Sequence, residues 1–370
     1  MKLPLTGVIN LIHEADEMES LTSGRCLATV PFGGRYRLID FVLSSMVNSG
    51  IPKVAVFAHR KFRSLMDHLG SGANWDLHRK MSGLFVLPPS MEDQTDFGKG
   101  DLYHFYRNRD YFARSALDYV VIARSHMVCN VDFAKVLERH RESGADITAV
   151  CKRTPEETPG LARKARVDGS GRIVEMQDHY GRLDSDIVSM EMYVLSKELL
   201  LDLVETSLAQ GRDHFVRHAI LSRLERLRVH AYLHEGALGV VNNIAAYYRH
   251  SMELLRPEVW RELFFKPGAI YTKVKDEPPT RYRSGADVSN SLIANGCDIE
   301  GTVTGSILFR GVKVARGAVV RNSIVMQNGV IGANGELDHC ILDKEVEIRP
   351  QMQLKGSSEV PFLALKRKVI

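Results

Sequence analysis

A pair of glycines followed by charged residues is the first feature of this sequence with the potential for chemistry. Gly33 and Gly34 permit a tight backbone turn, and Arg37 and Asp40 follow it one helical turn apart. At that spacing the two charged side chains lie on one face of a helix, where they either bind a ligand or pair with each other. The sequence leaves both roles open.

A run of acidic residues follows the first apolar segment. Its carboxylates belong to Glu14, Asp16, Glu17 and Glu19. Such a run is usually a solvated loop surface, and the alternative is a patch that docks a partner protein. Either way it opposes the binding of another anion, because like charges about 4 Å apart repel by roughly 4 kcal/mol at an effective dielectric of about 20.

The composition argues against several classes of protein. With 370 residues, 25% of them charged, and a net charge of +4, the chain does not resemble a dedicated nucleic-acid-binding protein. No apolar run reaches the roughly 18 residues that span a bilayer, and the amino terminus lacks a signal-peptide pattern. The cysteines are odd in number and lack C-x-x-C spacing: Cys26, Cys129, Cys151, Cys297 and Cys340. We therefore expect a cytoplasmic protein without nucleic-acid or membrane partners.

Apolar and amphipathic segments alternate through the first two thirds of the chain. This order predicts strands that cross over through helices into a mostly parallel sheet. The predicted helices are 37–48, ended by Gly50, a segment capped by Asn130 and ended by Gly144, and 245–255. The predicted strands are 7–12, 54–57, 119–123, 147–151 and 190–195.

A six-residue repeat marks the last part of the chain. A helix repeats every 3.6 residues and a strand every 2, so a sustained period of six favours a parallel β-helix over chance spacing in a Gly-rich meander. Small residues recur at Gly305, Gly311, Gly317, Ser323, Gly329 and Gly335, and apolar residues at Leu308, Val314, Val320 and Met326 and at Val312, Ala318, Ile324 and Val330. The expected organisation is a domain at 1–262, a linker at 263–290 and a β-helix at 291–370.

The glycine pair lies in a longer motif that begins at Pro31 and reads PFGGRYRLIDF. This motif, the later Ser189-Met190 with Tyr193-Val194, and the repeat region together resemble the glucose-1-phosphate adenylyltransferase (ADP-glucose pyrophosphorylase) family. The resemblance implies a Rossmann-like nucleotidyltransferase domain of the GT-A type, followed by a left-handed parallel β-helix. Its enzymes join ATP and glucose 1-phosphate into ADP-glucose and release pyrophosphate. The retained family residues are Phe32, Gly33, Gly34, Arg37, Asp40 and His126.

Against that family pattern, several catalytic groups are missing. Where the enzymes carry a glycine-rich phosphate loop, this chain has the acidic run, and Leu27 stands in place of a lysine. Ser125 replaces the metal-binding aspartate, beside Arg124, and a hydroxyl offers Mg²⁺ no ionised oxygen. The second metal aspartate aligns with Val240, or with Asn243 as the nearer match. His179 replaces the lysine that grips the sugar phosphate.

Such combined losses usually leave only trace activity. The chain resembles the GlgD-type subunit that accompanies a catalytic sister, so we expect a regulatory, weak or inactive subunit that activates this sister within a heterotetramer. A homo-oligomer alone is left open, as is activity alone. No cofactor is expected here, and Mg²⁺ only in the catalytic partner. The alternative is a competent enzyme with unconventional ligands, Asp101, Asp178 and His179. A hexapeptide acyltransferase or zinc enzyme is disfavoured because the repeats offer only His339.

The resemblance also implies a site for phosphosugar effectors. The candidate anion-binding residues are Arg25, Arg35, Arg37, Arg310 and Lys313. Guanidinium and ammonium groups bind phosphate through charge-assisted hydrogen bonds. The alternative is that these are scattered surface cations, since Arg and Lys are mostly exposed in any protein.

Overall fold

The computed structural model describes residues 2–14, 16–79, 82–89, 98–154, 162–178 and 183–370. The chain divides into two compact units, each made of separate segments. The first contains Met1–Ala15, Ile39–Leu238 and Phe264–Tyr271, and the second contains Asp16–Leu38, Gly239–Leu263 and Thr272–Ile370. These units are defined by contacts, and the consecutive segments 1–262, 263–290 and 291–370 remain a prediction from the sequence.

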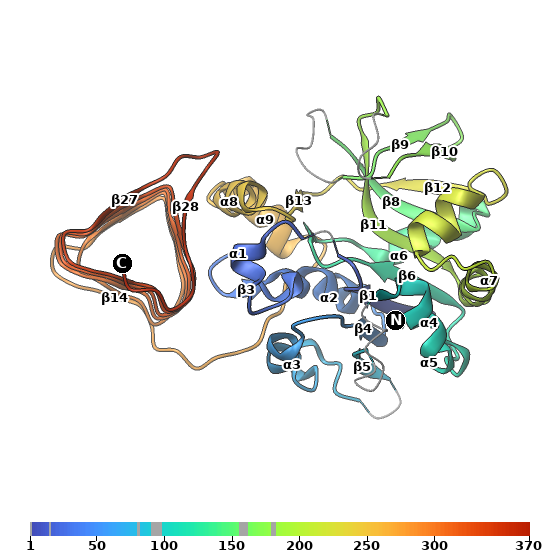
Figure 1. Ribbon diagram of the computed structural model, residues 1–370, viewed down its shortest axis with the longest axis horizontal. Helices are drawn as coiled ribbons and strands as arrows, with labels where there is room; N and C mark the ends of the chain where they lie inside the picture. The colour runs from blue at the N-terminus through green and yellow to red at the C-terminus, as the bar shows by residue number, and fades with distance from the viewer. Residues whose placement is uncertain (1, 15, 80–81, 90–97, 155–161, 179–182) are drawn as a thin grey trace. The chain divides into compact units, whose positions relative to one another are not determined.

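The first unit is built on a mostly parallel sheet, as predicted (Figure 1). Within the described residues its strand order is β12-β8-β11-β6-β1-β4-β5. Strand β1 pairs in parallel with β4 and β6, and β11 is antiparallel to β6 and β8. The strands are β1 (Leu5–Asn10), β4 (Lys53–Phe57), β5 (Gly83–Leu87), β6 (Tyr119–Ala123), β8 (Ile147–Arg153), β11 (Ile187–Ser196) and β12 (Val229–Leu233). All five predicted strands are confirmed, β6 with the predicted ends and the other four with shifted ends, whereas β5 and β12 were not predicted.

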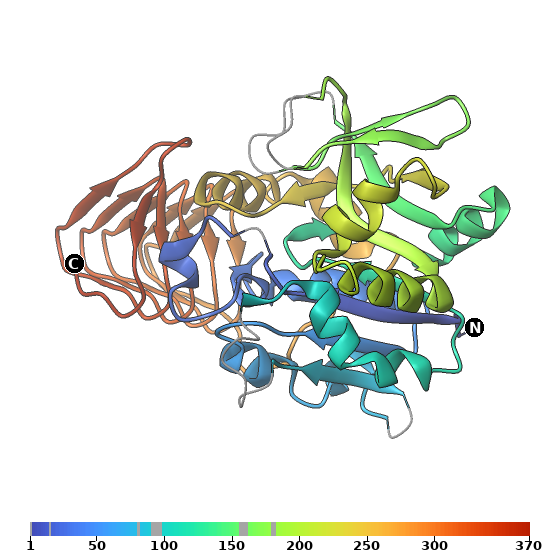
Figure 2. The same cartoon turned by 45° about the vertical axis from the view of Figure 1, so that its right-hand side comes forward.

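The helices of this unit cover both faces of the sheet (Figure 2). They are α2 (Leu38–Asn48), α3 (Arg63–Leu69), α4 (Asp101–Arg107), α5 (Arg109–Ala113), α6 (Phe133–Ser143) and α7 (Lys197–Leu208). Short elements complete the unit: η2 (Ala73–Trp75), β7 (Met127–Cys129), β9 (Ala165–Val167), β10 (Ile173–Met176), the π-helical η4 (Phe215–Ile220) and η5 (Leu221–Arg223). The predicted end of α6 at Gly144 is confirmed by its left-handed backbone, with φ of 59°.

The predicted cap of α6 was wrong by two residues. Asp132, not Asn130, caps this helix, because the Asp132 carboxylate accepts a hydrogen bond from the Ala134 amide at 3.0 Å. Asn130 instead donates through Nδ2 to the Gly268 carbonyl at 2.7 Å. Both side chains are cap-forming types, so the sequence alone did not decide between them.

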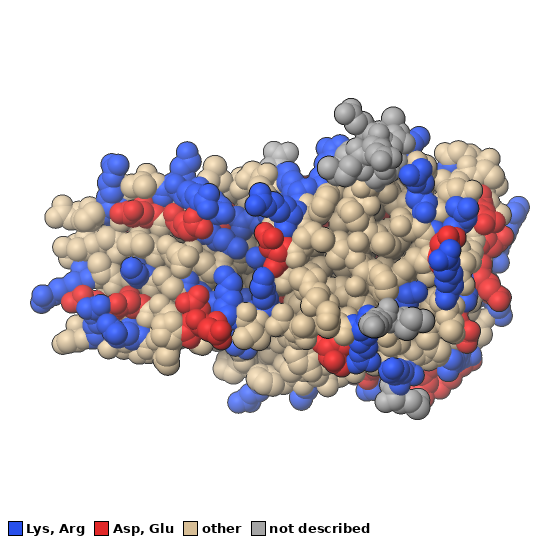
Figure 3. Space-filling view, turned by 90° about the horizontal axis from the view of Figure 1, so that it is seen from below, with Lys and Arg blue, Asp and Glu red and all other residues tan. Residues whose placement is uncertain are grey.

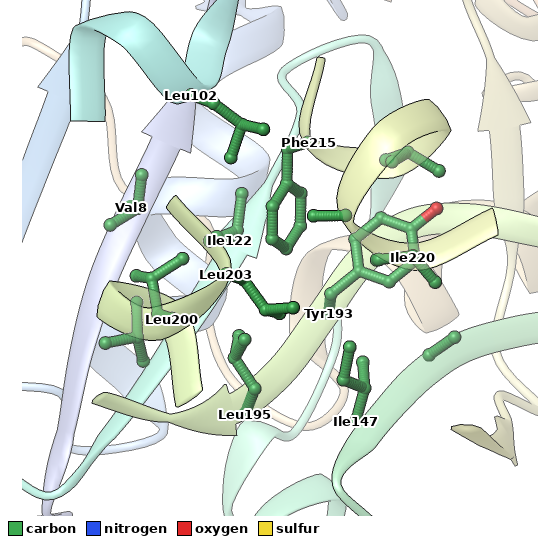
Figure 4. Packing of buried hydrophobic residues seen from close by; sticks show 14 of the residues in the cluster. Val8, Leu102, Ile122, Ile147, Tyr193, Leu195, Leu200, Leu203, Phe215 and Ile220 are labelled. Atoms are coloured by element: carbon green, nitrogen blue, oxygen red, sulfur yellow. The ribbon is translucent and has the colours of Figure 1, made fainter. Parts of the chain in front are cut away.

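One hydrophobic cluster joins the sheet to helices α4, α5 and α7. Figure 4 shows Tyr193 of β11 and Phe215 of η4 packed among aliphatic side chains. Their ring centroids lie 5.9 Å apart in an edge-to-face arrangement. This cluster fixes the strand ends and the start of η4, which carry the polar groups described below.

The second unit contains the glycine motif and the β-helix. Its first elements are α1 (Glu19–Thr22), η1 (Leu27–Thr29), β2 (Pro31–Phe32) and β3 (Tyr36–Arg37), followed by β13 (Leu238–Val240), α8 (Ile244–Glu253) and α9 (Pro257–Phe265). Strands β2 and β3 form an antiparallel hairpin. Gly33 and Gly34 make its turn with φ of 58° and 82°, so the predicted tight turn is confirmed.

The β-helix is a triangular prism of three parallel sheets (Figure 1). Its sheets are β14-β17-β20-β23-β26, β15-β18-β21-β24-β27 and β16-β19-β22-β25-β28. The strands are β14 (Arg281–Tyr282), β15 (Asp287–Ser289), β16 (Leu292–Ile293), β17 (Asp298–Ile299), β18 (Thr302–Thr304), β19 (Ile307–Leu308), β20 (Lys313–Val314), β21 (Val319–Arg321), β22 (Ile324–Val325), β23 (Val330–Ile331), β24 (Glu336–Asp338), β25 (Cys340–Leu342), β26 (Glu347–Ile348), β27 (Gln353–Lys355) and β28 (Phe362–Ala364). The first coil starts at Arg281, inside the expected linker. The sequence did not indicate this coil, because its residues are too exposed and polar to show the apolar repeat.

The spacing between equivalent residues of neighbouring coils departs from three strict repeats of six. It is 15 positions between Asp298 and Lys313, 17 between Ser306 and Ser323, and 22 between Cys340 and Phe362. The inward register therefore passes from Val320 to Val325, not to Met326, although both side chains are fully buried. Val330 is likewise only half-buried and Ile331 takes the inward place.

Charged side chains on the β-helix are of both signs. Figure 3 shows Lys and Arg interspersed with Asp and Glu on the face in view. Several are paired, as in Arg283 with Asp298 and Arg367 with Glu345. None of the helices described is long and apolar enough to cross a membrane.

Candidate functional site

The loop after β1 is fastened to the end of β6 by Arg124. Its Nη1 donates to the carbonyls of Asn10 and Ile12 at 3.1 and 2.5 Å, and its Nη2 lies 3.4 Å from the Asp101 carboxylate. Asn10 adds a hydrogen bond from Nδ2 to Asp101 at 2.8 Å. The loop thus presents carbonyl oxygens to a guanidinium, which is the opposite of a phosphate loop that presents amides to an anion.

A buried carboxylate occupies the amides that follow β6. Glu14 accepts hydrogen bonds from the Ser125 amide and from the Ser125 hydroxyl at 2.8 Å, and from the His126 amide at 3.3 Å. Nδ1 of His126 lies 3.3 Å from the same carboxylate, whose side chain is only 6% exposed. Burial opposes ionisation, but the hydrogen bond and charge of His126, with the charge of Arg124, hold the pKa of Glu14 below its ordinary value.

This arrangement corrects the expectation for the acidic run. Asp16 and Glu17 are exposed as a loop surface should be, whereas Glu14 is turned inward. The sequence did not reveal this difference, because four acids in one short segment look alike. His126, a retained family residue, is a partner of Glu14, and its side chain is 2% exposed.

The groups around Ser125 do not fit a magnesium ion. The Ser125 hydroxyl donates to Glu14, and the Glu14 oxygens are already used by donors of the protein itself. The cationic side chain of Arg124 lies close enough to act electrostatically on Glu14. Across the parts of the chain that are described, no three His, Cys, Asp or Glu side chains are grouped to hold a metal. Hard divalent cations need free carboxylate or carbonyl oxygens, which this corner does not supply.

A pocket of about 140 Å³ adjoins these groups within the first unit. Its polar wall is a chain of ion pairs. Arg163 donates through Nη1 to both oxygens of Glu191 at 2.7 and 2.9 Å, and through Nη2 to Asp178 at 2.7 Å. Asp178 also accepts from Arg217 at 2.6 Å. The lining residues are His13, Asp101, Arg124, His126, Arg163, Asp178, Glu191, His214, Phe215, Val216 and Arg217.

Two candidate ligands of the alternative enzyme are engaged in this pocket. Asp101 accepts from the Phe215 amide at 2.6 Å in addition to its bonds with Asn10 and Arg124. Asp178 lies between two guanidinium groups. The third candidate, His179, lies outside the described residues. Sequence reasoning named Glu14 only as one of four acids in a run and missed Arg163 and Glu191, to which only their charge could have drawn attention.

The remaining residues singled out by the family comparison are buried in the fold. Asp40 is completely buried in the first turn of α2, with Nε2 of His68 2.5 Å from its Oδ1. In the second unit, Phe32 is buried with its ring centroid 6.2 Å from that of Tyr247. Leu27 is buried in η1, and Val240 is buried at the end of β13.

Asn243, the nearer match to the second metal aspartate, has a structural use. Its side chain caps α8, because Oδ1 accepts a hydrogen bond from the Ala246 amide at 2.8 Å. The only oxygen of this side chain therefore has a partner. A metal at this position would have to displace the cap.

The five candidate cations of the second unit differ in their surroundings. Arg25 is buried and paired with Asp343, and Arg35 lies over the Tyr36 ring with its guanidinium carbon 5.1 Å from the centroid. Arg310 is 9% exposed, and Lys313 is exposed. Arg25 and Arg37 act instead on Lys344, which the sequence did not single out.

Lys344 is the centre of this smaller cationic group. Burial and the positive charges of Arg37 and Arg25 lower the pKa of Lys344 to about 7, although the charge of Asp343 opposes the shift. Nη1 of Arg25 is buried without a hydrogen-bond partner within the described structure. The side chains of Arg25, Arg37 and Lys344 are therefore called the cationic cluster of the second unit.

A mostly parallel sheet with covering helices, followed in the chain by a hexapeptide β-helix, is the architecture of a nucleotidyltransferase-family protein. Residues 16–255 match the nucleotidyl transferase family, and residues 278–359 match the family described as GlmU-like, C-terminal hexapeptide. The chain belongs to the nucleotidyl transferase family, in the group that contains GlgD and the glucose-1-phosphate adenylyltransferases.

Two similar proteins carry the same printed name, glycogen biosynthesis protein GlgD. That of Geobacillus stearothermophilus is 45% identical over 100% of this chain and 98% of its own length. That of Bacillus subtilis (strain 168) is 40% identical over 98% of this chain and 96% of its own length. A glucose-1-phosphate adenylyltransferase of Geobacillus stearothermophilus is 31% identical over 82% of this chain and 80% of its own length. The family expected from the sequence is therefore confirmed.

Proposed function

We propose that this chain is a regulatory subunit of an ADP-glucose pyrophosphorylase in glycogen biosynthesis, with little or no catalytic activity of its own. The observation that carries the proposal is the position of Glu14. Its buried carboxylate accepts the hydrogen bonds of the Ser125 amide and hydroxyl and of the His126 amide. These donors lie at the end of a parallel strand, the edge at which open α/β sheets bind their ligands.

The triphosphate of ATP has no equivalent set of donors in this corner. It would have to displace a carboxylate that belongs to the chain and is therefore always present at high effective concentration. If Glu14 stayed, two anions would share one site, which costs roughly 4 kcal/mol at about 4 Å separation. Arg124 cannot compensate, because it already holds the carbonyls of Asn10 and Ile12.

In this proposal the chain acts by assembling with a catalytic sister subunit, as a heterotetramer, and raises the activity of that sister. Mg²⁺ belongs to the catalytic partner. The names of the similar GlgD proteins support a place in glycogen biosynthesis. The cluster Arg25, Arg37 and Lys344 is the proposed site for a phosphosugar effector, because guanidinium and ammonium groups bind phosphate through charge-assisted hydrogen bonds.

The test is a pyrophosphate-release assay on the purified chain, on the catalytic subunit and on both together. We expect the chain alone to turn over at most about 10⁻³ as fast as the catalytic subunit, in keeping with the loss of several charge-stabilising groups. The mixture should exceed the catalytic subunit alone. Robust turnover by the chain alone, or no effect in the mixture, contradicts the proposal.

The effector site has its own test in the mixture. Arg25→Gln together with Lys344→Gln should abolish activation by a phosphosugar, whereas Lys313→Gln, a cation outside the cluster, should not. Co-purification of the variant with the catalytic subunit is the control for assembly. Activation that survives the double change would remove the cluster from the proposal.

A further inference from the structure

A second depression in the first unit is separate from the pocket that contains Arg163. Its volume is about 500 Å³, and no described residue lines both sites. It lies at the edge of the sheet where β12 meets the hairpin of β9 and β10, and Figure 1 shows these strands side by side. Strand β11 serves the two sites with different residues, because Ile187 lines the depression and Glu191, with a backbone φ of 54°, lines the Arg163 pocket. We call the depression the edge pocket, and its lining includes Arg139, Arg153, Asp168, Ile187 and Leu233.

The backbone of β12 leaves one donor unpaired at the edge pocket. His234 N donates to the Cys151 carbonyl of β8 at 2.7 Å, and alternate residues of a parallel strand bond to the same neighbour, so Leu233 faces the outer edge. On that edge Ala231 N donates to the Gly171 carbonyl of the hairpin at 2.9 Å. Among the described residues, none accepts a hydrogen bond from Leu233 N. This N–H is therefore available to a ligand or to water.

The turn of the hairpin forms a fixed wall of the edge pocket. Oδ1 of Asp168 accepts hydrogen bonds from the Ser170 amide and hydroxyl at 2.8 and 2.6 Å and from the Arg172 amide at 3.1 Å. Such local bonds from an aspartate side chain hold a turn without outside help. A Cβ on Gly169 would meet no atom within 4 Å, so the turn leaves open space beside it. A wall that is formed before binding lowers the entropic cost of taking up a ligand.

Two guanidinium groups from different elements line the edge pocket. Arg139 of α6 makes no hydrogen bond to a described residue, and its Nη1 lies 3.6 Å from Glu142. Arg153, at the end of β8, donates through Nη1 to Asp186 at 2.5 Å. The arginine side chains are 50% and 62% exposed, so both ion pairs are screened by solvent and contribute little. Most of their N–H groups are therefore available to an added anion.

Apolar side chains make up another part of the lining. Ile187 is 6% exposed, and Val167 and Ala231 are half-buried against the hydrophobic cluster of the sheet. Leu233 is 44% exposed, which leaves much of a large apolar side chain in water. Covering these groups removes apolar surface from water and favours a ligand with an apolar body. The volume of the edge pocket also lies within the roughly 300–1,000 Å³ of ligand sites in general.

The charged groups of the edge pocket indicate the charge of its ligand. A guanidinium binds a carboxylate through two parallel N–H bonds, and it binds phosphate in the same way. Asp168 also lines the pocket, and its negative charge opposes an added anion more strongly when that anion is doubly charged. A carboxylate is therefore favoured over a phosphate ester.

We propose that the edge pocket binds a small organic carboxylate with an apolar body, such as an aryl- or alkyl-carboxylic acid. The carboxylate is bound by the guanidinium groups of Arg139 and Arg153, and the apolar body covers Ile187 and Leu233. The inference does not rest on the proposed function, because the edge pocket shares no residue with the Glu14 contact or with the cationic cluster of the second unit.

The test is ligand-observed NMR on the full chain with phenylpropionate as the probe. A ligand of about eleven non-hydrogen atoms should bind with a Kd on the order of 1 mM. Phenylpropanol lacks the charge and acetate lacks the apolar body, so each should bind at least about fivefold more weakly. Phenylpropyl phosphate, which has the same body and a second negative charge, should also bind more weakly than the carboxylate.

Arginine variants test the cationic side of the edge pocket. Arg139→Gln combined with Arg153→Gln should weaken phenylpropionate binding by about fivefold or more, because the carboxylate loses both guanidinium partners. Arg114→Gln is the matched control. Arg114 is also an exposed arginine on a helix with a partner one turn away, Asp110, and it lies outside the pocket.

Leucine variants test the apolar side. Leu233→Asp should abolish binding, because it removes apolar surface and adds a second acid to the lining. Leu365→Asp is the matched control, since Leu365 is 42% exposed and belongs to the second unit. All the substituted side chains are well exposed, so the variants should fold, and circular dichroism checks this.

Four outcomes overturn the inference. They are no binding of phenylpropionate at tens of millimolar, phenylpropanol or phenylpropyl phosphate binding as tightly as the carboxylate, unchanged affinity in the double arginine variant or in Leu233→Asp, and equal weakening by Arg114→Gln. The last would show a general attraction to surface charge. The proposed function is unaffected by any of these outcomes, because the turnover assay tests it separately.

Discussion

The hydroxyl of Ser125 donates a hydrogen bond to the carboxylate of Glu14 at 2.8 Å. Ser125 stands where the family resemblance implies a metal-binding aspartate, and its partner is an acid from the loop after β1. A carboxylate with a lowered pKa contributes stability that is present above its unfolded pKa and lost as the pH falls through its folded pKa. The Glu14 contact should therefore stabilise the fold at neutral pH and fail in acid.

The first prediction concerns this contact. Glu14→Gln should lower the free energy of unfolding at pH 7 by about 1–3 kcal/mol, because Gln offers one acceptor oxygen to donors that now share two. The difference from wild type should shrink as the pH falls below 4.5, the ordinary value for Glu. Urea unfolding at several pH values measures it. Glu17→Gln, at an exposed acid, is the control and should change stability by less than about 0.5 kcal/mol.

A second prediction follows from the strained backbone at Glu191. Glu191→Gly and Glu191→Ala both remove the partner of Arg163, and each should destabilise the protein by about 3–5 kcal/mol before any backbone effect. Only Gly also relieves the left-handed conformation, so the Gly variant should be more stable than the Ala variant by about 1 kcal/mol. Equal midpoints in parallel urea titrations would show that the backbone at this position is not strained.

The third prediction concerns Lys344, whose pKa of about 7 lies below the ordinary 10.5. A buried amine with a lowered pKa binds fewer protons in the folded state than in the unfolded one. Stability should therefore rise with pH between about 7 and 10.5, by at most about 1.4 kcal/mol per pH unit. Lys344→Met should remove this dependence and be the more stable protein below pH 7. Lys355→Met, at an exposed lysine, should leave the slope of stability against pH unchanged.

The fourth prediction concerns the corners of the β-helix. Gly317 has φ of 71°, and a Cβ there would lie 2.1 Å from Oδ1 of Asn334 on the next coil. Gly317→Ala should cost about 1–3 kcal/mol of stability, from backbone strain and the displaced Asn334 side chain. Gly169→Ala is the matched control, because no atom lies within 4 Å of a Cβ at that position. Equal thermal midpoints for the two variants would contradict the assignment of Gly317 to a strained corner.

The sequence predicted the glycine turn and the parallel sheet because both depend on local chemistry. Gly33 and Gly34 adopt the left-handed backbone that few other residues tolerate, and the apolar runs form strands wherever they pair. The six-residue period likewise follows from side chains stacking on the next coil. Met326, a member of the repeat, is fully buried, but Val325 and not Met326 belongs to the main β-helix cluster, because the spacing between neighbouring coils is not a strict multiple of six.

What the sequence determined by itself was the fold and the family. What only the tertiary structure decided was which acid of the loop after β1 turns inward and which charges pair across the pocket. Glu14 lies 111 positions from Ser125, and Arg163 lies 28 positions from Glu191. Contacts over such separations depend on the order of the strands in the sheet. The same strand order leaves other Glu and Arg side chains of the chain in solvent.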